Sequence, residues 1–365
     1  MRSFRASASA TATASASASA RARARARARD RLLAHRVRRW PGALALALAL
    51  PLAGCATGSD SDSGRPGAVS SSAPSPTATA APEVRAQLRV DGGVRQYLLH
   101  RTPAHDGPRP LLIAFHGRGA DAAELRAKTR LERAATARGM LVAFPEGLGH
   151  GWGAGTRATK QRPDPGLDVR FTEALIKHLV RTERADPDRV YVAGFSNGGS
   201  MALRMAAERP ALLAGAASVS GQLPTGNAAV EPTGPVPVMV VYGADDPVRP
   251  LAGLPSPPPD PKEPILPTRS ARDSAAAFAA AGGAGEPVTR KEEGYDRTVW
   301  RFRSDADDAP GGDRRPDGSV QLLVVADAGH TWPGSTVPPP EGFGPVSKAL
   351  DATDTILDFL TGPGR

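Results

Sequence analysis

Two hydrophobic patterns alternate along residues 84–363. Short apolar runs bounded by turn residues are typical of strands, and longer mixed segments with a helical period are typical of helices. The short runs predict strands at 86–91, 94–101, 110–115, 140–144, 189–194, 214–220, 236–243, 298–303 and 319–326. The longer segments predict helices at 120–137, 167–183, 198–208, 269–281 and 347–361. This alternation indicates an α/β fold, with a mostly parallel sheet flanked by helices in a single domain.

A serine lies at the junction between one predicted strand and the next predicted helix. The apolar run 189–193 leads into Gly194-Phe195-Ser196-Asn197-Gly198, and a helix-like segment begins at once. The G-x-S-x-G pattern alone is weak, because small residues also make ordinary turns. Between a strand and a helix it indicates a serine held on a sharp turn, where glycines let the two elements close around it. Ser196 is therefore the candidate nucleophile.

Only one of the seven histidines follows Ser196 in the sequence. In the arrangement that the serine motif suggests, the catalytic residues occur in the order serine, acid, histidine. His330 follows the strand-like run 319–326 and is flanked by Gly329 and Trp332. A lone histidine in a loop is more often solvated and inactive, but its order and its position at a strand end favour His330 as the general base.

The acid of such a triad is expected after an intervening strand. Asp245 and Asp246 follow the predicted strand 236–243 and compete for this role. A carboxylate there would hold the histidine in the right tautomer and stabilise its charged form. The alternative is a solvated turn, since Asp and Pro are ordinary turn residues. We favour Asp246.

Two backbone N–H groups are expected to bind the negative charge that develops on the reacting carbonyl oxygen. One belongs to Asn197, the residue after the nucleophile, and the other to Arg118 in the glycine-rich turn 116–119 that follows a predicted strand. His116, in the same turn, is expected to be structural rather than catalytic.

Four blocks of the sequence closely resemble the secreted polyhydroxybutyrate depolymerase and feruloyl esterase family of α/β-hydrolases: 116–119, 191–200, 243–250 and 329–334. The resemblance covers roughly residues 84–363 and implies the α/β-hydrolase fold. It also implies a serine esterase that forms an acyl-enzyme, acting on hydroxyalkanoate polyesters or on feruloyl and acetyl esters of polysaccharides. The chain departs from the family pattern at Tyr242, at 249–252 and in a long proline-rich loop at 255–267, and these departures leave the substrate open.

Two tryptophans are open to two interpretations. Trp152 and Trp332 could form an apolar or sugar-stacking wall for the substrate, or could equally belong to the core.

A tethered binding protein without turnover is the main alternative to an enzyme, although such proteins usually lose a triad residue and none is missing here. Acyl transfer to an acceptor other than water is compatible with the same residues.

The first 54 residues read as a targeting segment rather than as part of the folded domain. A basic region precedes the apolar run 43–50, which is too short to span a bilayer, and the sequence Leu-Ala-Gly-Cys ends at Cys55. This ending resembles a bacterial lipobox, whose cysteine is lipidated and becomes the first residue of the mature protein. Residues 55–83 then form a flexible linker. The expected location is extracellular or at the bacterial cell surface, as a membrane-anchored lipoprotein.

The charge and the cysteine content of the sequence limit which partners and which disulfides can be expected. The whole sequence has a net charge of +9, but residues 1–54 hold 11 Arg and one Asp, which leaves 35 basic and 36 acidic residues in the rest. The positive excess therefore belongs to the targeting segment and gives no support to nucleic-acid binding. A single cysteine excludes disulfides within the chain. We expect a monomer without metal or cofactor, whose partner is an ester substrate and which contacts the membrane only through its lipid.

Overall fold

The computed structural model describes residues 83–102, 107–160, 162–255, 265–302 and 318–362. The predicted signal region, Cys55 and the linker up to residue 82 lie outside these ranges, so the lipoprotein interpretation stays a prediction. Within the described ranges, no helix combines the length and the apolar character needed to cross a membrane.

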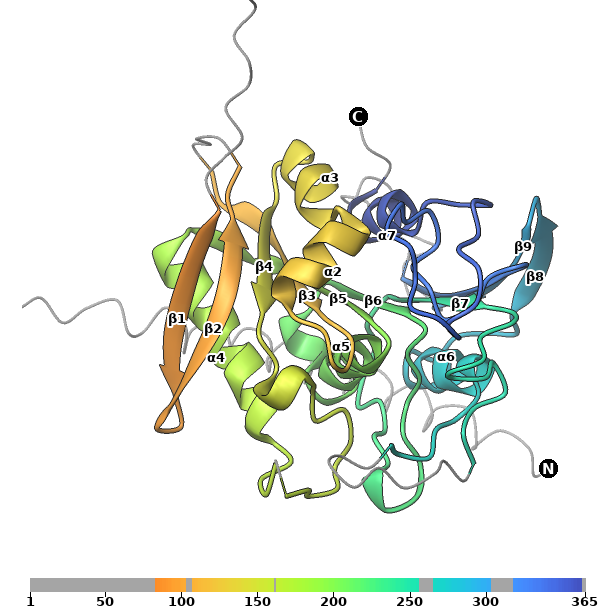
Figure 1. Ribbon diagram of the computed structural model, residues 1–365, viewed down its shortest axis with the longest axis horizontal. Helices are drawn as coiled ribbons and strands as arrows, with labels where there is room; N and C mark the ends of the chain where they lie inside the picture. The colour runs from red at the N-terminus through yellow and green to blue at the C-terminus, as the bar shows by residue number, and fades with distance from the viewer. Residues whose placement is uncertain (1–82, 103–106, 161, 256–264, 303–317, 363–365) are drawn as a thin grey trace, which may run out of the picture. The chain divides into compact units, whose positions relative to one another are not determined.

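A ten-stranded sheet forms the centre of the described structure (Figure 1). Its strands are β1 (Val84–Val90), β2 (Gly93–His100), β3 (Arg109–Phe115), β4 (Leu141–Pro145), β5 (Ala185–Phe195), β6 (Gly215–Val219), β7 (Val238–Gly243), β8 (Val288–Glu292), β9 (Tyr295–Arg301) and β10 (Ser319–Val325). Their order is β1-β2-β4-β3-β5-β6-β7-β10-β9-β8. From β4 to β10 neighbouring strands run parallel, whereas the pairs at both edges are antiparallel.

Helices cover both faces of this sheet (Figure 1). One face carries α2 (Ala122–Thr129), α3 (Leu131–Ala137) and α7 (Ala352–Thr361), and the other carries α4 (Leu167–Thr182), α5 (Asn197–Glu208) and α6 (Ala271–Ala281). Short 3₁₀ turns are η2 (Leu148–His150), η3 (Pro210–Leu212) and η4 (Gly226–Ala228). Successive residues of a strand point to opposite faces, so in β3 Ile113 packs toward α4 and α5, and Leu112 packs toward α2 and α3.

The predicted α/β class, with a mostly parallel sheet between helices, is confirmed, and three elements differ from the sequence prediction. The helix predicted at 120–137 is two helices, because Arg130 adopts a left-handed conformation with φ 53°. The helix predicted at 347–361 begins only at Ala352, where the Asp351 side chain accepts hydrogen bonds from the first turn. Strand β8 was not predicted, because all five of its residues are exposed and give no apolar signal.

The parallel strands bring the predicted site residues to one edge of the sheet. In an open α/β sheet, ligands bind outside the carboxyl ends of the strands. Strand β5 ends directly before Ser196, β7 ends shortly before Asp246, and β10 ends shortly before His330. The turn that contains Arg118 follows β3, which lies next to β5.

The turn at Ser196 is one of the tightest points of the fold. Ser196 has φ 55° and ψ −118°, a conformation that non-glycine residues seldom adopt. A Cβ atom on Gly194 would lie 2.2 Å from the carbonyl oxygen of Gly198, and one on Gly198 would lie 2.1 Å from the carbonyl oxygen of Phe115. Both glycines are therefore required because the backbones of β3, β5 and α5 touch here.

We expect Gly198→Ala to destabilise the protein, because the added methyl group meets backbone that cannot move aside without displacing β3. The loss in free energy of unfolding should be about 1–3 kcal/mol, the usual cost of overpacking a dense interior. Gly285→Ala is the matched control, since a Cβ atom there meets nothing within 4 Å. Urea unfolding of both variants tests the claim, which fails if the two unfold alike.

Candidate active site

Three side chains at the ends of parallel strands form a continuous line of polar contacts. The Nε2 atom of His330 lies 2.8 Å from the Oγ atom of Ser196, which is 134 positions away in the sequence. The Nδ1 atom of His330 lies 2.8 Å from the Oδ2 atom of Asp246. When Nδ1–H donates to this carboxylate, Nε2 is left to accept the hydrogen bond of the serine hydroxyl. The structure thus brings Ser196, His330 and Asp246 into one relay.

Of the two candidate acids, Asp246 faces the histidine and Asp245 does not. The Asp246 side chain is fully buried, whereas Asp245 is exposed. The Oδ1 atom of Asp246 accepts hydrogen bonds from the backbone N–H groups of Val248 at 3.0 Å and Arg249 at 2.7 Å. These two bonds hold the carboxylate so that its other oxygen is directed at His330.

His330 lies in an apolar environment that disfavours its charged form. Only 2% of its surface is exposed, and its ring packs against the rings of Phe195 and Phe343 at centroid distances of 5.1 and 5.3 Å. Burial lowers the pKa of His330, and the hydrogen bond to Asp246 opposes this shift without reversing it. The imidazole is therefore neutral at ordinary pH and able to accept a proton.

The two predicted N–H donors both border the cavity at Ser196. Asn197 is the first residue of α5, and the N–H groups of a helix's first turn have no acceptor within the helix. Arg118 belongs to the turn after β3, and its side chain is exposed. The partial positive charge of the α5 N-terminus adds to the attraction for an anion at this point.

His116 is a structural part of this turn. It is completely buried, its Nε2 atom accepts a hydrogen bond from the N–H of Gly147 at 2.9 Å, and its Nδ1 atom lies 2.8 Å from the carbonyl oxygen of Gly117. The ring is therefore neutral, with its proton on Nδ1, and burial lowers its pKa. His116 fastens the turn after β3 to the loop after β4.

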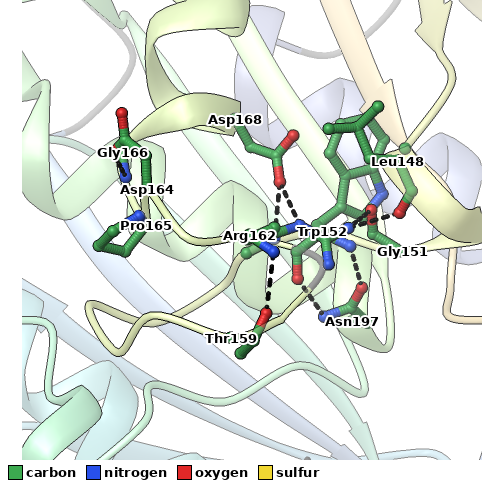
Figure 2. A network of polar contacts seen from close by, with 12 residues as sticks. Leu148, Gly151, Trp152, Thr159, Arg162, Asp164, Pro165, Gly166, Asp168 and Asn197 are labelled. Carbon is green, nitrogen blue, oxygen red and sulfur yellow. Dashed lines mark hydrogen bonds and ion pairs between the residues drawn. The ribbon is translucent and has the colours of Figure 1, made fainter. Parts of the chain in front are cut away.

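The side chain of Asn197 holds the loop that forms one wall of the cavity (Figure 2). Its Oδ1 atom accepts from the N–H of Trp152 at 2.7 Å, and its Nδ2 atom donates to the carbonyl oxygen of the same residue at 3.1 Å. This double contact fixes Trp152 against the start of α5. It also fixes the orientation of Asn197, whose backbone N–H is the predicted oxyanion donor.

Buried charges hold the rest of this loop (Figure 2). Asp168 in the first turn of α4 is buried between two arginines, with Arg162 Nε at 2.8 Å and Arg95 at 2.9 Å. Burial lowers the pKa of Arg95, and the Asp168 carboxylate opposes that shift. Asp168 also accepts from the N–H of Gly153 at 2.8 Å, and Arg162 donates to the carbonyl oxygens of Leu148 and Gly151.

A cavity of about 580 Å³ opens at Ser196 and His330. Its walls come from α2, from the Trp152 loop and from the loops after β7 and β10. Trp152 is among the residues that line it, yet only 1% of this side chain is exposed. Its indole N–H donates to the carbonyl oxygen of His116 at 3.0 Å, and its ring packs edge-on against Phe115. Trp152 therefore supports the cavity wall and offers no open ring face for stacking.

Of the two roles left open for Trp332, substrate wall or core, the structure places this residue in the core. Its side chain is 1% exposed, belongs to the core beneath α7 and is not among the residues that line the cavity. Its indole N–H donates to the Thr353 hydroxyl at 3.0 Å, and this hydroxyl in turn donates to the carbonyl oxygen of Thr129. Ser335 adds a hydrogen bond to the carbonyl oxygen of Lys128. Trp332 thus helps to fasten the loop after β10 to the end of α2.

Nothing in the sequence singles out the buried charges. Arg95 and Arg162 look like ordinary surface arginines, and Asp168 looks like a favourable first-turn residue of a helix. The one available signal was that Arg95 and Asp168 lie within predicted elements, whereas Arg162 lies in a polar stretch that carries no such signal. Among the described residues, no group of three or more His, Cys, Asp or Glu side chains could hold a metal ion.

The sequence is similar to a known protein family and to several known proteins. The Phospholipase/Carboxylesterase family matches residues 168–254. A protein of Nocardia uniformis subsp. tsuyamanensis named "Putative esterase NocK" is 41% identical over 290 residues, which cover 75% of this chain and 81% of that protein. Feruloyl esterase B of Piromyces equi is 30% identical over 148 residues, covering 39% of this chain and 27% of that protein.

Among solved structures, an acetyl xylan esterase from Aspergillus awamori is 16% identical and aligns with a TM-score of 0.47, over 73% of this chain and 93% of that one. The names of the sequence relatives agree with the esterase and feruloyl esterase part of the resemblance found in the sequence. Its polyhydroxybutyrate depolymerase part stays a prediction.

We expect Asp168→Asn to lower the free energy of unfolding by about 3–5 kcal/mol, because it leaves two buried arginines without their counter-charge. The amide still fits the space and can still accept from Gly153. Asp164→Asn is the control, since this residue lies in the same segment and pairs with Arg170 at the surface, where a lost ion pair has little effect. Equal unfolding midpoints in urea for the two variants would show that the buried charges do not hold the loop.

Proposed function

The chain belongs to the esterases of the α/β-hydrolase fold, and on this premise we propose that it cleaves carboxylic esters with Ser196 as nucleophile. His330 acts as general base and acid, and Asp246 orients it. The observation that carries the proposal is the unbroken relay of two 2.8 Å contacts from the Ser196 hydroxyl through His330 to a buried carboxylate. The relay lies at a cavity large enough for a small ester.

The geometry supports a two-step reaction. In the first step, the Ser196 oxygen bonds to the ester carbonyl carbon while His330 takes the hydroxyl proton, and the proton then passes to the departing alcohol as its C–O bond breaks. In the second step, water gives a proton to His330 and attacks the carbonyl carbon of the acyl-enzyme. The proton then passes from His330 to the Ser196 oxygen as its bond to the acyl carbon breaks, which releases the carboxylic acid and restores the serine. Each step passes through a tetrahedral oxyanion.

The proposed oxyanion site is formed by the backbone N–H groups of Asn197 and Arg118. Donors fixed before the reaction stabilise charge where it develops and need no reorganisation. The fixed position of Asn197 at the N-terminus of α5, with its side chain bound to Trp152, supports this role.

The proposed substrates are short hydroxyalkanoate polyesters or feruloyl and acetyl esters of polysaccharides. Relatives named feruloyl esterase support the feruloyl ester class. The cavity of about 580 Å³ is lined by apolar side chains such as Leu125, Phe195 and Leu266, which suits an aryl or short acyl group better than a bulky one. Hydrolysis of methyl ferulate, acetylated xylan and a hydroxybutyrate oligomer, measured side by side, distinguishes these classes.

Ser196→Ala should abolish ester hydrolysis and labelling by a fluorophosphonate probe, with kcat falling roughly 10⁴- to 10⁶-fold, because triad residues act as a unit. Asp246→Asn should be far more damaging than Asp245→Asn, since only Asp246 contacts His330. Assays with p-nitrophenyl acetate and circular dichroism of each variant provide the measurement and the folding control. A Ser196→Ala enzyme that keeps more than about a hundredth of the wild-type rate would disprove the nucleophile assignment.

The rate should rise with pH as His330 loses its proton. Because burial lowers the pKa of His330, the midpoint of the kcat/KM profile should lie below about 6.5, the usual value for an imidazole. The positive charge of Lys128 contributes to this lowering, so Lys128→Met should move the midpoint upward. Lys177→Met, on the exposed side of α4, is the control. A wild-type midpoint above that of free imidazole would show that another group is the base.

A further inference from the structure

The side chains around the cavity are unequally charged. Among the described residues that line it are five cationic residues, Arg118, Lys128, Arg157, Arg162 and Arg249, and one carboxylate, Glu124. Arg162 is paired with Asp168, and Glu124 is bound to the N–H of Asp121 in the cap of α2. A cleft lined by one sign of charge with apolar walls concentrates ligands of the opposite sign.

Arg249 carries a buried donor that the described structure leaves without a partner. It lines the cavity three residues after Asp246, and its Nε atom is buried without a hydrogen-bond partner among the described residues. Burial lowers the pKa of Arg249, and repulsion from Arg118 adds to this, although Tyr242 and Asp246 oppose it. A buried N–H of a charged group without a partner is costly, and an anionic group that reaches it recovers this cost.

Lys128 provides a second positive charge beside the nucleophile. Its Nζ atom lies 4.6 Å from the ring centre of Phe195, the residue before Ser196. Burial lowers the pKa of Lys128, so this ammonium group is also partly removed from water. Both Lys128 and Arg249 act electrostatically on His330, so the two cations lie within range of the reacting centre.

From this arrangement we infer that the cavity recognises esters that carry a free carboxylate in addition to the ester group, with Arg249 as the main anchor and Lys128 in support. Arg249 suits this task because its planar guanidinium binds a carboxylate through two parallel hydrogen bonds. The inference rests on the proposed esterase function and narrows its substrates to monoesters of dicarboxylic acids or esters of hydroxy acids.

Two pairs of substrates of equal size test the inference on the wild-type enzyme. Monomethyl adipate and the methyl ester of adipic acid monoamide place the charge on the acyl side, and 4-acetoxybenzoate and 4-acetoxybenzamide place it on the alcohol side. In at least one pair, kcat/KM for the carboxylate should exceed that for the amide by roughly 10-fold or more, as a charge-assisted hydrogen bond implies. Added salt should reduce the preference.

Arg249→Gln then identifies the anchor. It removes the charge but keeps the backbone N–H that Asp246 uses, so the carboxylate substrate should lose much more kcat/KM than the amide. Arg249→Lys should retain part of the preference. Arg290→Gln, on the exposed edge strand β8, removes the same charge at a residue that does not line the cavity and should leave both rates and their ratio unchanged.

The outcomes separate the two proposals. If the wild type hydrolyses both members of each pair equally well and Ser196→Ala is inactive, the carboxylate site is wrong and the esterase function stands. If Arg249→Gln prefers the carboxylate over the amide substrate as strongly as the wild type does, Arg249 is not the anchor and the proposed carboxylate site is also wrong. Should Arg249→Gln fail to fold, the preference of the wild type for the carboxylate substrates and the salt dependence of that preference still decide whether the cavity recognises a carboxylate. Equal activity of Ser196→Ala and wild type would instead refute the esterase mechanism itself.

Discussion

The close approach of three backbones at Ser196 is the constraint on which the site depends. Strands β3 and β5 and helix α5 meet so tightly that neither Gly194 nor Gly198 has room for a side chain. The surrounding structure holds Ser196 in a conformation that costs on the order of 1–3 kcal/mol. This one packing contact sets the position of the hydroxyl, of the Asn197 N–H and of the turn after β3 relative to one another.

Apolar burial and buried ion pairs together stabilise the structure around Ser196. Apolar side chains on both faces of the sheet bury the central strands, and so fix where Ser196, Asp246 and His330 emerge. The loop that forms a cavity wall buries Trp152 in the same way and is held in addition by charge, through Asp168 and its two arginines. The chain thus relies on apolar burial for the scaffold and on apolar burial together with buried ion pairs for the site's wall.

Sequence reasoning recovered the sheet because its central strands are continuous apolar runs with turn residues between them. It found the positions of Ser196 and His330 because motif and chain order leave few choices. It missed β8, which has no buried face, and the break at Arg130, which depends on a single backbone angle. It could not decide whether Trp332 belongs to the core or to the cavity wall, because a tryptophan near a strand end fits either place equally well until the position of α7 is known. The charges at 95, 162 and 168 come together only in three dimensions.

The hydrogen bonds that join the end of α2 to the loop carrying His330 have a mechanical consequence. Thr353 and Ser335 bind the carbonyl oxygens of Thr129 and Lys128, so α2 and that loop behave as one stiff rim of the cavity. Opening this rim would pull the imidazole away from the nucleophile. The side near Leu254 and Leu266 carries no triad residue. One side of the entrance therefore keeps the reacting groups aligned, and the other borders the cavity without taking part in that alignment.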